Sequence, residues 1–203
     1  MSLIDRVVAA VTPVESEDAR RQARAKARAA AGDNDWLALV LQHHEAIEMA
    51  FAAVRTTGDP VARLAAQKAL ALLLTGHSNA EEAVIYPALV HFGHKSRGMI
   101  GYTEQAGAKA NMGELEYLDP MSQEYIDKLD HIRGAVAHHM YEEENDRFLD
   151  LKRISPAEQT RLTERFREEF DRYMGRDPSS HRSTDPRNSR LGTNAPRPQP
   201  ERH

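Results

Sequence analysis

At two places in this chain, a histidine followed four residues later by a glutamate interrupts a row of apolar residues at helical spacing. The pairs are His77 with Glu81 and His139 with Glu143. On a helix, residues four apart lie on the same face, so both side chains of a pair can reach one point beside the axis. Burying these groups without partners costs several kcal/mol. The pattern predicts helices that pack around a shared partner for these groups, and a metal ion supplies one.

The rest of the chain also favours helices over strands. Aliphatic residues and alanine are plentiful, whereas alternating β-branched residues are scarce. We expect an all-α fold, an antiparallel four-helix bundle with an extra N-terminal helix, a C-terminal helix and a disordered tail. The expected helices are 12–31 with Thr12 as N-cap, 36–56, 60–90, one from Gly101 to about Leu118, one opening at Asp119-Pro120, and one opened by a capping box at Ser155–Glu158.

The order of these elements predicts three parts of the chain. Residues 1–34 form a helical extension, and residues 35–175 form the bundle with a packed C-terminal helix. From Arg176 onward the chain holds five of its ten prolines and almost no large apolar residues, so residues 176–203 are expected to be a disordered Pro/Arg-rich tail. The glycine-containing stretch 92–101 is predicted to be a connection.

Composition excludes several classes of site. The chain has no cysteine, which excludes disulfides, iron–sulfur clusters and cysteine-ligated zinc. No apolar run is long enough for a membrane span and no leader pattern is present, so we expect a cytoplasmic protein with no membrane association. The net charge of -4 makes nucleic acid an unlikely partner. The basic N-terminal helix could mediate association, such as a homodimer, although a solvated basic face is our preferred interpretation.

A further histidine is expected to join the two pairs. His44 shares a row with Val40, Ile47 and Phe51, whereas its neighbour His43 also lies in a passable apolar row, so the choice between the two is less decisive. In the fourth bundle helix, His139 lies in a more apolar row than His138. Oxygen and imidazole ligands without thiolate favour iron or manganese and do not exclude zinc. Two glutamates facing each other across a bundle can bridge a pair of irons.

These residues resemble the hemerythrin-like, HHE cation-binding family. The resemblance covers roughly residues 35–152 and rests on the pattern His, His-x3-Glu, a further ligand, His-x3-Glu, with the local sequences HSNAEEAVIYPAL from His77 and HMYEEENDRF from His139. It implies a di-iron centre with oxo or hydroxo and carboxylate bridges. By this resemblance the metal ligands are His44, His77, Glu81, His139 and Glu143, with both glutamates bridging.

The third bundle helix departs from the family pattern, because it contains no histidine. Tyr102 lies about where the family places its third-helix ligand, and the chain resembles the members that use a tyrosine there. Tyr102 is therefore our predicted phenolate ligand, and Gln105 is the alternative ligand. The non-functional interpretation of Tyr102 is a core tyrosine at a helix interface. A phenolate ligand favours the ferric state of iron, whereas reversible O2 carriage needs a stable diferrous state. A tyrosine ligand therefore makes an O2 carrier the less attractive interpretation.

The predicted function is redox turnover at non-haem di-iron, of a peroxidase or catalase kind, on hydrogen peroxide or on nitric oxide or O2. The alternative is a sensor or binding protein without turnover, in which the site signals through the N-terminal helix or the tail. No sequence feature names an electron-donor partner.

Overall fold

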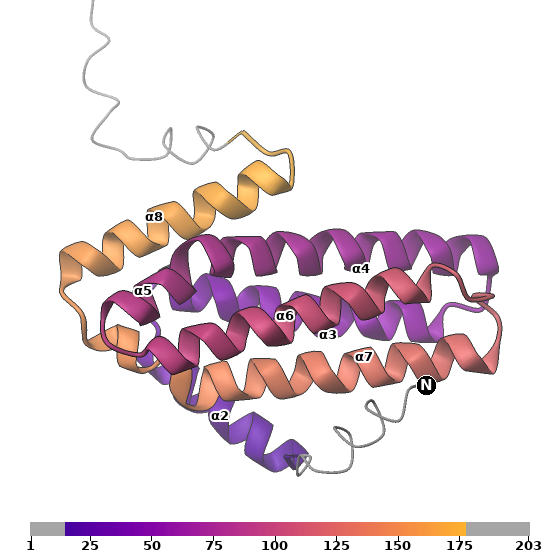
Figure 1. Cartoon of the computed structure of the whole chain (residues 1–203), viewed down its shortest axis with the longest axis horizontal. Coiled ribbons are helices and arrows are strands. Elements are labelled where there is room, and N and C mark those ends of the chain that lie inside the picture. The colour runs from indigo at the N-terminus through magenta and orange to yellow at the C-terminus, as the bar shows by residue number, and fades with distance from the viewer. Residues whose placement is uncertain (1–14, 178–203) are drawn as a thin grey trace, which may run out of the picture.

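The computed structural model describes residues 15–177, leaving aside the side chain of Arg97, and every regular element in this range is a helix (Figure 1). This confirms the all-α class for the described part of the chain. Residues 1–14, and residues 178–203 of the predicted tail, lie outside it. The elements are α2 (Glu17–Ala30), α3 (Trp36–Thr56), α4 (Pro60–Ala80), the π-helical turn η1 (Glu81–Ile85), α5 (Tyr86–His91), α6 (Lys95–Leu115), α7 (Gln123–Glu142), the π-helical turn η2 (Glu143–Arg147), the 3-10 turn η3 (Asp150–Arg153) and α8 (Pro156–Tyr173).

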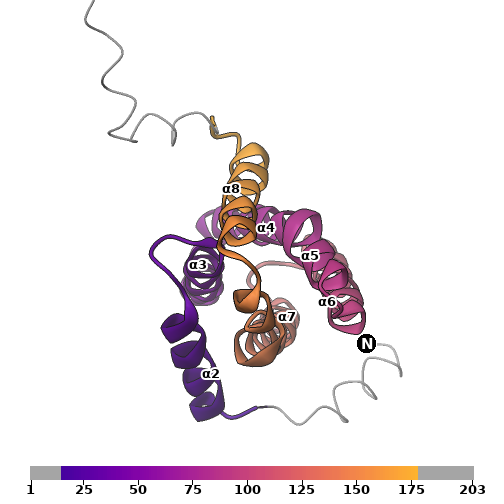
Figure 2. The ribbon, with the colours of Figure 1, turned by 90° about the vertical axis from the view of Figure 1, so that its left-hand side faces the viewer.

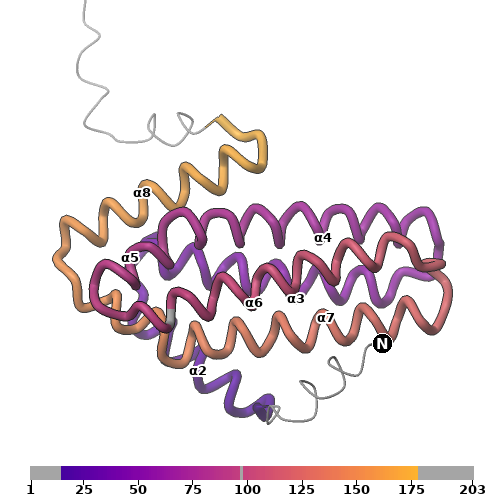
Figure 3. Tube along the Cα trace, viewed as in Figure 1, coloured from indigo at the N-terminus to yellow at the C-terminus, as the bar shows by residue number. Residues whose placement is uncertain are grey.

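Four long helices, α3, α4, α6 and α7, lie side by side, and η1 and α5 continue the line of α4 (Figures 1 and 3). Viewed from the end, they surround a common interior (Figure 2). The remaining helices pack on the outside: α8 crosses α4 and α3, and α2 lies against α3, α7 and η2. None of the helices in residues 15–177 combines the length and apolarity that crossing a membrane requires.

Local signals place several of these helices where the sequence predicted them. The helix α3 spans 36–56 as expected, and the carboxylate of its N-cap Asp35 accepts a hydrogen bond from the Ala38 backbone N–H at 2.9 Å. The capping box of α8 forms in both directions between Ser155 and Glu158. Both predictions are confirmed. They could be made from the sequence because each depends on residues close together in the chain.

Two predicted helix starts are wrong, and a third lies outside the described residues. The structure begins α2 at Glu17 with Ser16 as N-cap, whereas the predicted N-cap Thr12 is not among the described residues. It begins α7 at Gln123 with Ser122 as N-cap rather than at Pro120. The largest difference is in α6, which begins at Lys95, inside the stretch 92–101 predicted to be a connection.

The glycines of that stretch explain the error in α6. Gly93 makes the turn, with a positive φ of 96°. Gly98 and Gly101 instead lie within α6, where it crosses Tyr86. A Cβ atom on Gly101 would lie 2.6 Å from the Tyr86 ring, and one on Gly98 would lie 3.0 Å from the Tyr86 carbonyl oxygen. These two glycines are therefore points of close helix approach, not breaks in a helix.

The apolar core is divided into two clusters. One contains Trp36, Phe148 and Phe166 and includes the contacts of α8; the other contains Phe51 and Leu129 and fills the opposite end of the long helices. Along α3 the first cluster ends at Leu41 and the second begins at Ile47, and the buried polar side chain of His44 lies between them. A polar layer thus interrupts the core at the level of the candidate site.

Candidate metal centre

Two π-helical turns position the glutamates of the His-x3-Glu pairs. Glu81 begins η1 and Glu143 begins η2, and in each turn a backbone N–H five residues later, from Tyr86 or Phe148, donates to the glutamate carbonyl oxygen. Such turns are rare and occur frequently at functional sites. Their presence on both helices sets the direction of the chain immediately after each candidate ligand.

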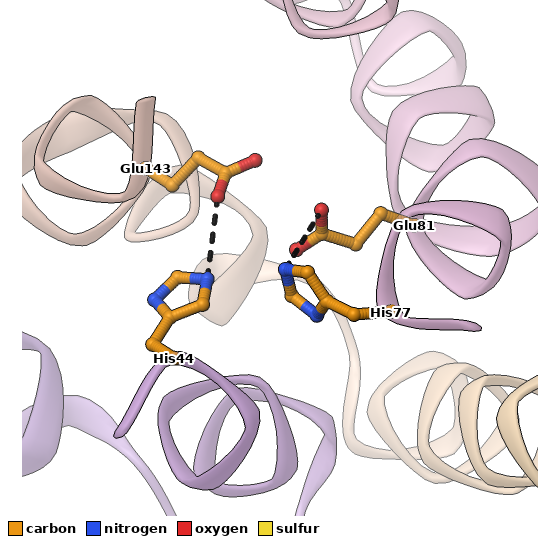
Figure 4. Close-up of side chains that lie close together, drawn as sticks. All are labelled: His44, His77, Glu81 and Glu143. Atoms are coloured by element: carbon orange, nitrogen blue, oxygen red, sulfur yellow. Dashed lines mark ion pairs between the residues drawn. The ribbon is translucent and has the colours of Figure 1, made fainter. Parts of the chain in front are cut away.

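Side chains from three helical segments converge at these turns (Figure 4). His44 Nε2 lies 3.4 Å from Glu143 Oε2, and His77 Nε2 lies 3.4 Å from Glu81 Oε2. All four residues are buried, and each offers one ligand atom within 4.8 Å of the others. This group could hold a metal ion.

His139 and Tyr86 extend the group on the other side of Glu143. His139 Nε2 lies 3.2 Å from Glu143 Oε1, and the Tyr86 hydroxyl donates to the same oxygen at 2.9 Å. The hydroxyl also lies 3.1 Å from His139 Nε2 and 3.3 Å from Glu81 Oε2. Tyr86 is therefore in contact with three predicted ligands. We call His44, His77, Glu81, Tyr86, His139 and Glu143 the ligand cluster.

In two of the histidines, the ring nitrogen that faces away from the cluster contacts a carboxylate. His44 Nδ1 lies 2.7 Å from Glu144 Oε1, and Arg24 of α2 donates to Glu144 through Nη2 at 2.9 Å. His139 Nδ1 lies 2.8 Å from Glu104 Oε2, which also accepts from Arg147 at 2.7 Å. A carboxylate on the far nitrogen fixes the tautomer and orientation that a metal-binding imidazole needs. Both Nε2 atoms are thereby aimed at the cluster.

Several buried polar atoms in the cluster form no well-aligned hydrogen bond among the described residues, although His44 Nε2 and His77 Nε2 each face a carboxylate oxygen at 3.4 Å. They are His44 Nε2, both ring nitrogens of His77, Glu81 Oε1 and Glu143 Oε2. A native structure rarely leaves buried polar groups unpaired, because each loses its hydration without compensation. Several such atoms that face one another are the expected signature of a site for a cation.

The electrostatics of the histidines differ within the cluster. Burial opposes the charging of His44, but hydrogen bonds with Glu143 and Glu144 outweigh it and raise its pKa to about 9. Burial also opposes the charging of His139, and the negative charge of Glu143 leads the effects that raise its pKa to about 10. His77 has no such carboxylate on its far nitrogen, and burial followed by the charge of His44 lowers its pKa well below the usual range.

The two carboxyl groups and the phenol respond in the same environment. Burial, and then the negative charge of Glu143, raise the pKa of Glu81 to about 8. Burial opposes the ionisation of Glu143, but the charge of His139 lowers its pKa well below the usual range. Burial and the charge of Glu143 raise the pKa of Tyr86 well above its usual value. Without a metal, the cluster therefore stores protons that a cation would displace.

Of the residues predicted to be ligands, the structure brings His44, His77, Glu81, His139 and Glu143 together. His43 lies outside the group, with its ring centroid 3.9 Å from that of Phe170 and 5.7 Å from that of His77. His138 is only partly buried, and its Nδ1 lies 2.8 Å from Glu15 Oε2.

Tyr102 is not brought into the cluster, which corrects its assignment as the phenolate ligand. Its hydroxyl donates to the Glu82 backbone carbonyl at 2.7 Å, and its ring packs edge-on against Tyr86. The alternative residue Gln105 does reach the cluster, where its Nε2 donates to Glu81 Oε2 at 2.6 Å. Tyr102 thus supports the tyrosine that does reach the ligands.

Tyr86 is the residue that the sequence analysis missed. At about 100° per residue, an α-helix turns a side chain five positions after Glu81 roughly 140° away from it. The π turn η1 closes its hydrogen bond over five residues and brings Tyr86 back to the face of Glu81. The available signal was the close approach required at Gly98 and Gly101, which are spaced for one helix face.

A second group of potential ligands, Glu104, His138 and Glu142, lies nearby and is partly buried. Arg147 forms ion pairs with both glutamates. Because a guanidinium already neutralises these carboxylates, we regard this group as the support of His139 rather than as a separate cation site.

The described residues therefore define a helical protein with a buried histidine–carboxylate cluster that could hold a metal ion. No family model matches the chain, and no solved structure matches it significantly. A curated DNA nickase from Nostoc sp. is 29% identical over 87 residues, which is 43% of this chain and 25% of that protein. The chain thus spans about a quarter of the length of this relative. The resemblance to the hemerythrin-like family rests on the residues of its motifs.

Proposed function

We propose that this chain is a hemerythrin-like protein in which α3, α4 with its continuation, α6 and α7 form an antiparallel four-helix bundle around a non-haem di-iron centre. The short connections between these helices support the arrangement, because consecutive helices joined by short loops pack as antiparallel neighbours. The centre would react with hydrogen peroxide, nitric oxide or O2. Redox turnover is the function that we favour.

The observation that carries this proposal is the buried ligand cluster with its unpartnered atoms. It contains imidazole, carboxylate and phenol groups, and the described residues include no thiolate, a donor set that suits iron. His44 and His77 face both carboxylates from one side, and His139 and Tyr86 lie on the other side of Glu143. This arrangement supports the proposal that Glu81 and Glu143 bridge two ions.

Iron bound there would supply Lewis acidity and a store of electrons. The protein's own groups orient the ligands: Glu144 and Glu104 hold the far nitrogens of His44 and His139. The Tyr86 hydroxyl donates a hydrogen bond to Glu143 Oε1. Ionisation of this phenol would add a strong anionic metal ligand. The two apolar clusters of the core lie on either side of the site along the bundle.

The decisive experiment is to purify the protein aerobically, count its metals, and record the visible spectrum before and after hydrogen peroxide or nitric oxide. We expect about two irons per chain and rapid peroxide consumption. Glu81→Ala should remove most of the metal and the activity, whereas Glu82→Ala, a change of the adjacent partly exposed carboxylate, should preserve both. A protein without iron, or one with equal activity in the two variants, would refute the proposal.

A second candidate function is sensing without turnover, favoured by the link between α2 and the site. Arg24 joins α2 to Glu144, and Glu144 contacts His44. A change at the ligand cluster would reach an outer helix through only two side chains. Reversible spectral changes with nitric oxide or O2, without peroxide consumption, would favour this function.

The name of the Nostoc relative raises DNA nicking as a third function. Against it, the cavity beside the ligand cluster has a volume of about 20 Å³, too small for a phosphodiester and its sugars. Arg24 and Arg147, which lie near the cluster, are already engaged by buried carboxylates. Incubation of the metal-loaded protein with supercoiled plasmid tests this function, and we expect no nicked product.

A further inference from the structure

A small cavity adjoins the ligand cluster and is lined by two of its members, His77 and His139. Its volume, measured at the centre of a water molecule, is about 20 Å³. One water needs roughly 10–15 Å³ by this measure, so the cavity suits a ligand of about two non-hydrogen atoms. Apolar side chains dominate the lining, among them Ile47, Leu74 and Val136.

Gln105 and His77 are the polar side chains of this lining that have atoms without a hydrogen-bond partner among the described residues, and His77 belongs to the ligand cluster. Gln105 Nε2 donates to Glu81 Oε2 at 2.6 Å, and because Glu81 as a metal-bound carboxylate only accepts, the amide nitrogen faces that oxygen in the metal-loaded protein. The carbonyl oxygen Oε1 then has no partner among the described residues, although only 3% of the Gln105 surface is exposed. Ser78, also in the lining, can donate or accept and does not discriminate between ligands.

An unpaired acceptor beside a cavity selects for a ligand that carries a hydrogen-bond donor. Hydrogen peroxide has two O–H groups, whereas nitric oxide and O2 have none. The cavity meets solvent on its α6–α7 side, where Glu104 and Ala108 are partly exposed and Ala135 is exposed. A small neutral molecule could enter there without passing the core clusters.

We propose that hydrogen peroxide binds in this cavity and donates a hydrogen bond to Gln105 Oε1. The assignment rests on the proposed di-iron function. Of the three small molecules proposed there, it selects hydrogen peroxide as the substrate. Gln105 thereby acts in substrate recognition, while its amide nitrogen holds the carboxylate of Glu81.

The test compares peroxide with nitric oxide in the iron-loaded protein. In Gln105→Met, which keeps the length of the side chain but removes the acceptor, we expect the KM for peroxide to rise about tenfold, the loss of one hydrogen bond. The affinity of the reduced protein for nitric oxide, read from the visible spectrum, should change much less. The KM for peroxide relative to the Kd for nitric oxide should therefore also rise about tenfold. Iron content is measured for every variant.

A steric pair of variants tests the cavity itself. Ala108→Leu fills it and should weaken both ligands at least tenfold, whereas Ala110→Leu, at an exposed position of the same helix, should weaken neither. The inference is overturned if Gln105→Met weakens both ligands equally, if Ala108→Leu has no effect, or if the iron-loaded protein binds nitric oxide but ignores peroxide. These results leave the di-iron centre intact, whereas a protein without iron refutes the proposed function as well.

Discussion

Tyr86 and Tyr102 are two adjacent tyrosines with different partners. Tyr86 contacts side-chain oxygens of the ligand cluster, whereas Tyr102 donates to a backbone carbonyl outside it. A phenol among buried carboxylates and imidazoles can become a phenolate when a cation replaces its proton. The two positions therefore form a natural matched pair for assigning the tyrosine of this site.

The first prediction uses that pair. In the iron-loaded protein, Tyr86→Phe should abolish a phenolate-to-iron charge-transfer band in the visible spectrum, because the phenol oxygen next to Glu143 is lost. Tyr102→Phe should keep the band, since it removes only the bond to the Glu82 carbonyl. Loss of the band in Tyr102→Phe alone would restore Tyr102 as the ligand.

The second prediction concerns protons. In the protein without metal, His44, His139 and Glu81 have pKa values raised to about 9, 10 and 8, so all three hold a proton at pH 7. A metal must displace these three protons and, when Tyr86 binds as a phenolate, the phenol proton as well, about four in all, and raising the pH makes this displacement easier. Metal affinity should therefore increase from pH 6 to pH 8. Calorimetric titration in two buffers of different ionisation enthalpy counts the protons, and pH-independent uptake would contradict the assignment.

At the level of the helices, α2 is held mainly by its charges. Its buried residues are only Ala23 and Ala27, whereas Arg24 pairs with both Glu144 and Glu48. Burial opposes the charge of Arg24, but its hydrogen bonds with the two glutamates raise its pKa further above the usual value. The guanidinium is therefore a permanent positive charge between α2 and the support of His44.

The third prediction follows from this contact. Arg24→Gln leaves the buried Glu144 carboxylate with His44 but without its guanidinium partner, which should cost about 2 kcal/mol of unfolding free energy. Trypsin should also cleave α2 faster at its remaining basic residues. The control Arg21→Gln changes an exposed arginine that pairs only within α2, and should have little effect. Equal urea stability of the two variants would show that α2 is held in another way.

For the molecule as a whole, the ligand cluster separates the two apolar clusters of the core. Buried histidines and glutamates replace apolar contacts at this level, and their unpartnered atoms weaken the packing. A metal ion would pair these atoms and connect α3, α4 with its continuation, and α7 with η2. Stability should therefore depend on metal more strongly than in a bundle with a continuous core.

The fourth prediction is a loss of stability on metal removal. A ligand present at a hundred times its Kd stabilises a protein by about 2.7 kcal/mol, which corresponds to a Tm shift of about 5–10 °C for a chain of this size. Chelation should lower the Tm by this amount in the wild type. It should do so equally in His131→Ala, an exposed change, and should have no effect in His77→Ala. A chelation-insensitive wild type would argue against a structural role of the metal.

Sequence periodicity and capping signals were sufficient to predict the helical fold class and the position of the candidate site along the helices. The bounds of α3 and the capping box of α8 depend on residues within a few positions of one another, so short-range rules predict them. The position of His77, Glu81, His139 and Glu143 on inward rows follows from helical spacing, whereas spacing left the choice between His43 and His44 open. These features required no knowledge of which helices pack together.

The start of α6 and the choice of tyrosine could not be obtained in this way. Gly98 and Gly101 have the composition of a loop, and only the crossing of α6 over Tyr86 gives them a place inside a helix. Tyr86 lies off the inward row of an α-helix until η1 inserts its wider turn, and such a turn is rare enough that spacing does not predict it.

By itself, the sequence determined that this chain forms helices and that two histidine–glutamate pairs occupy their inward faces, because these properties depend on side chains within one or two turns. Only the tertiary structure decided which groups meet. It placed Tyr86 rather than Tyr102 against the carboxylates, supported two histidines through Glu144 and Glu104, and left the oxygen of Gln105 without a partner beside a small cavity. The physical reason is that contacts between helices depend on close approach and turn geometry, which residues distant in the chain specify jointly.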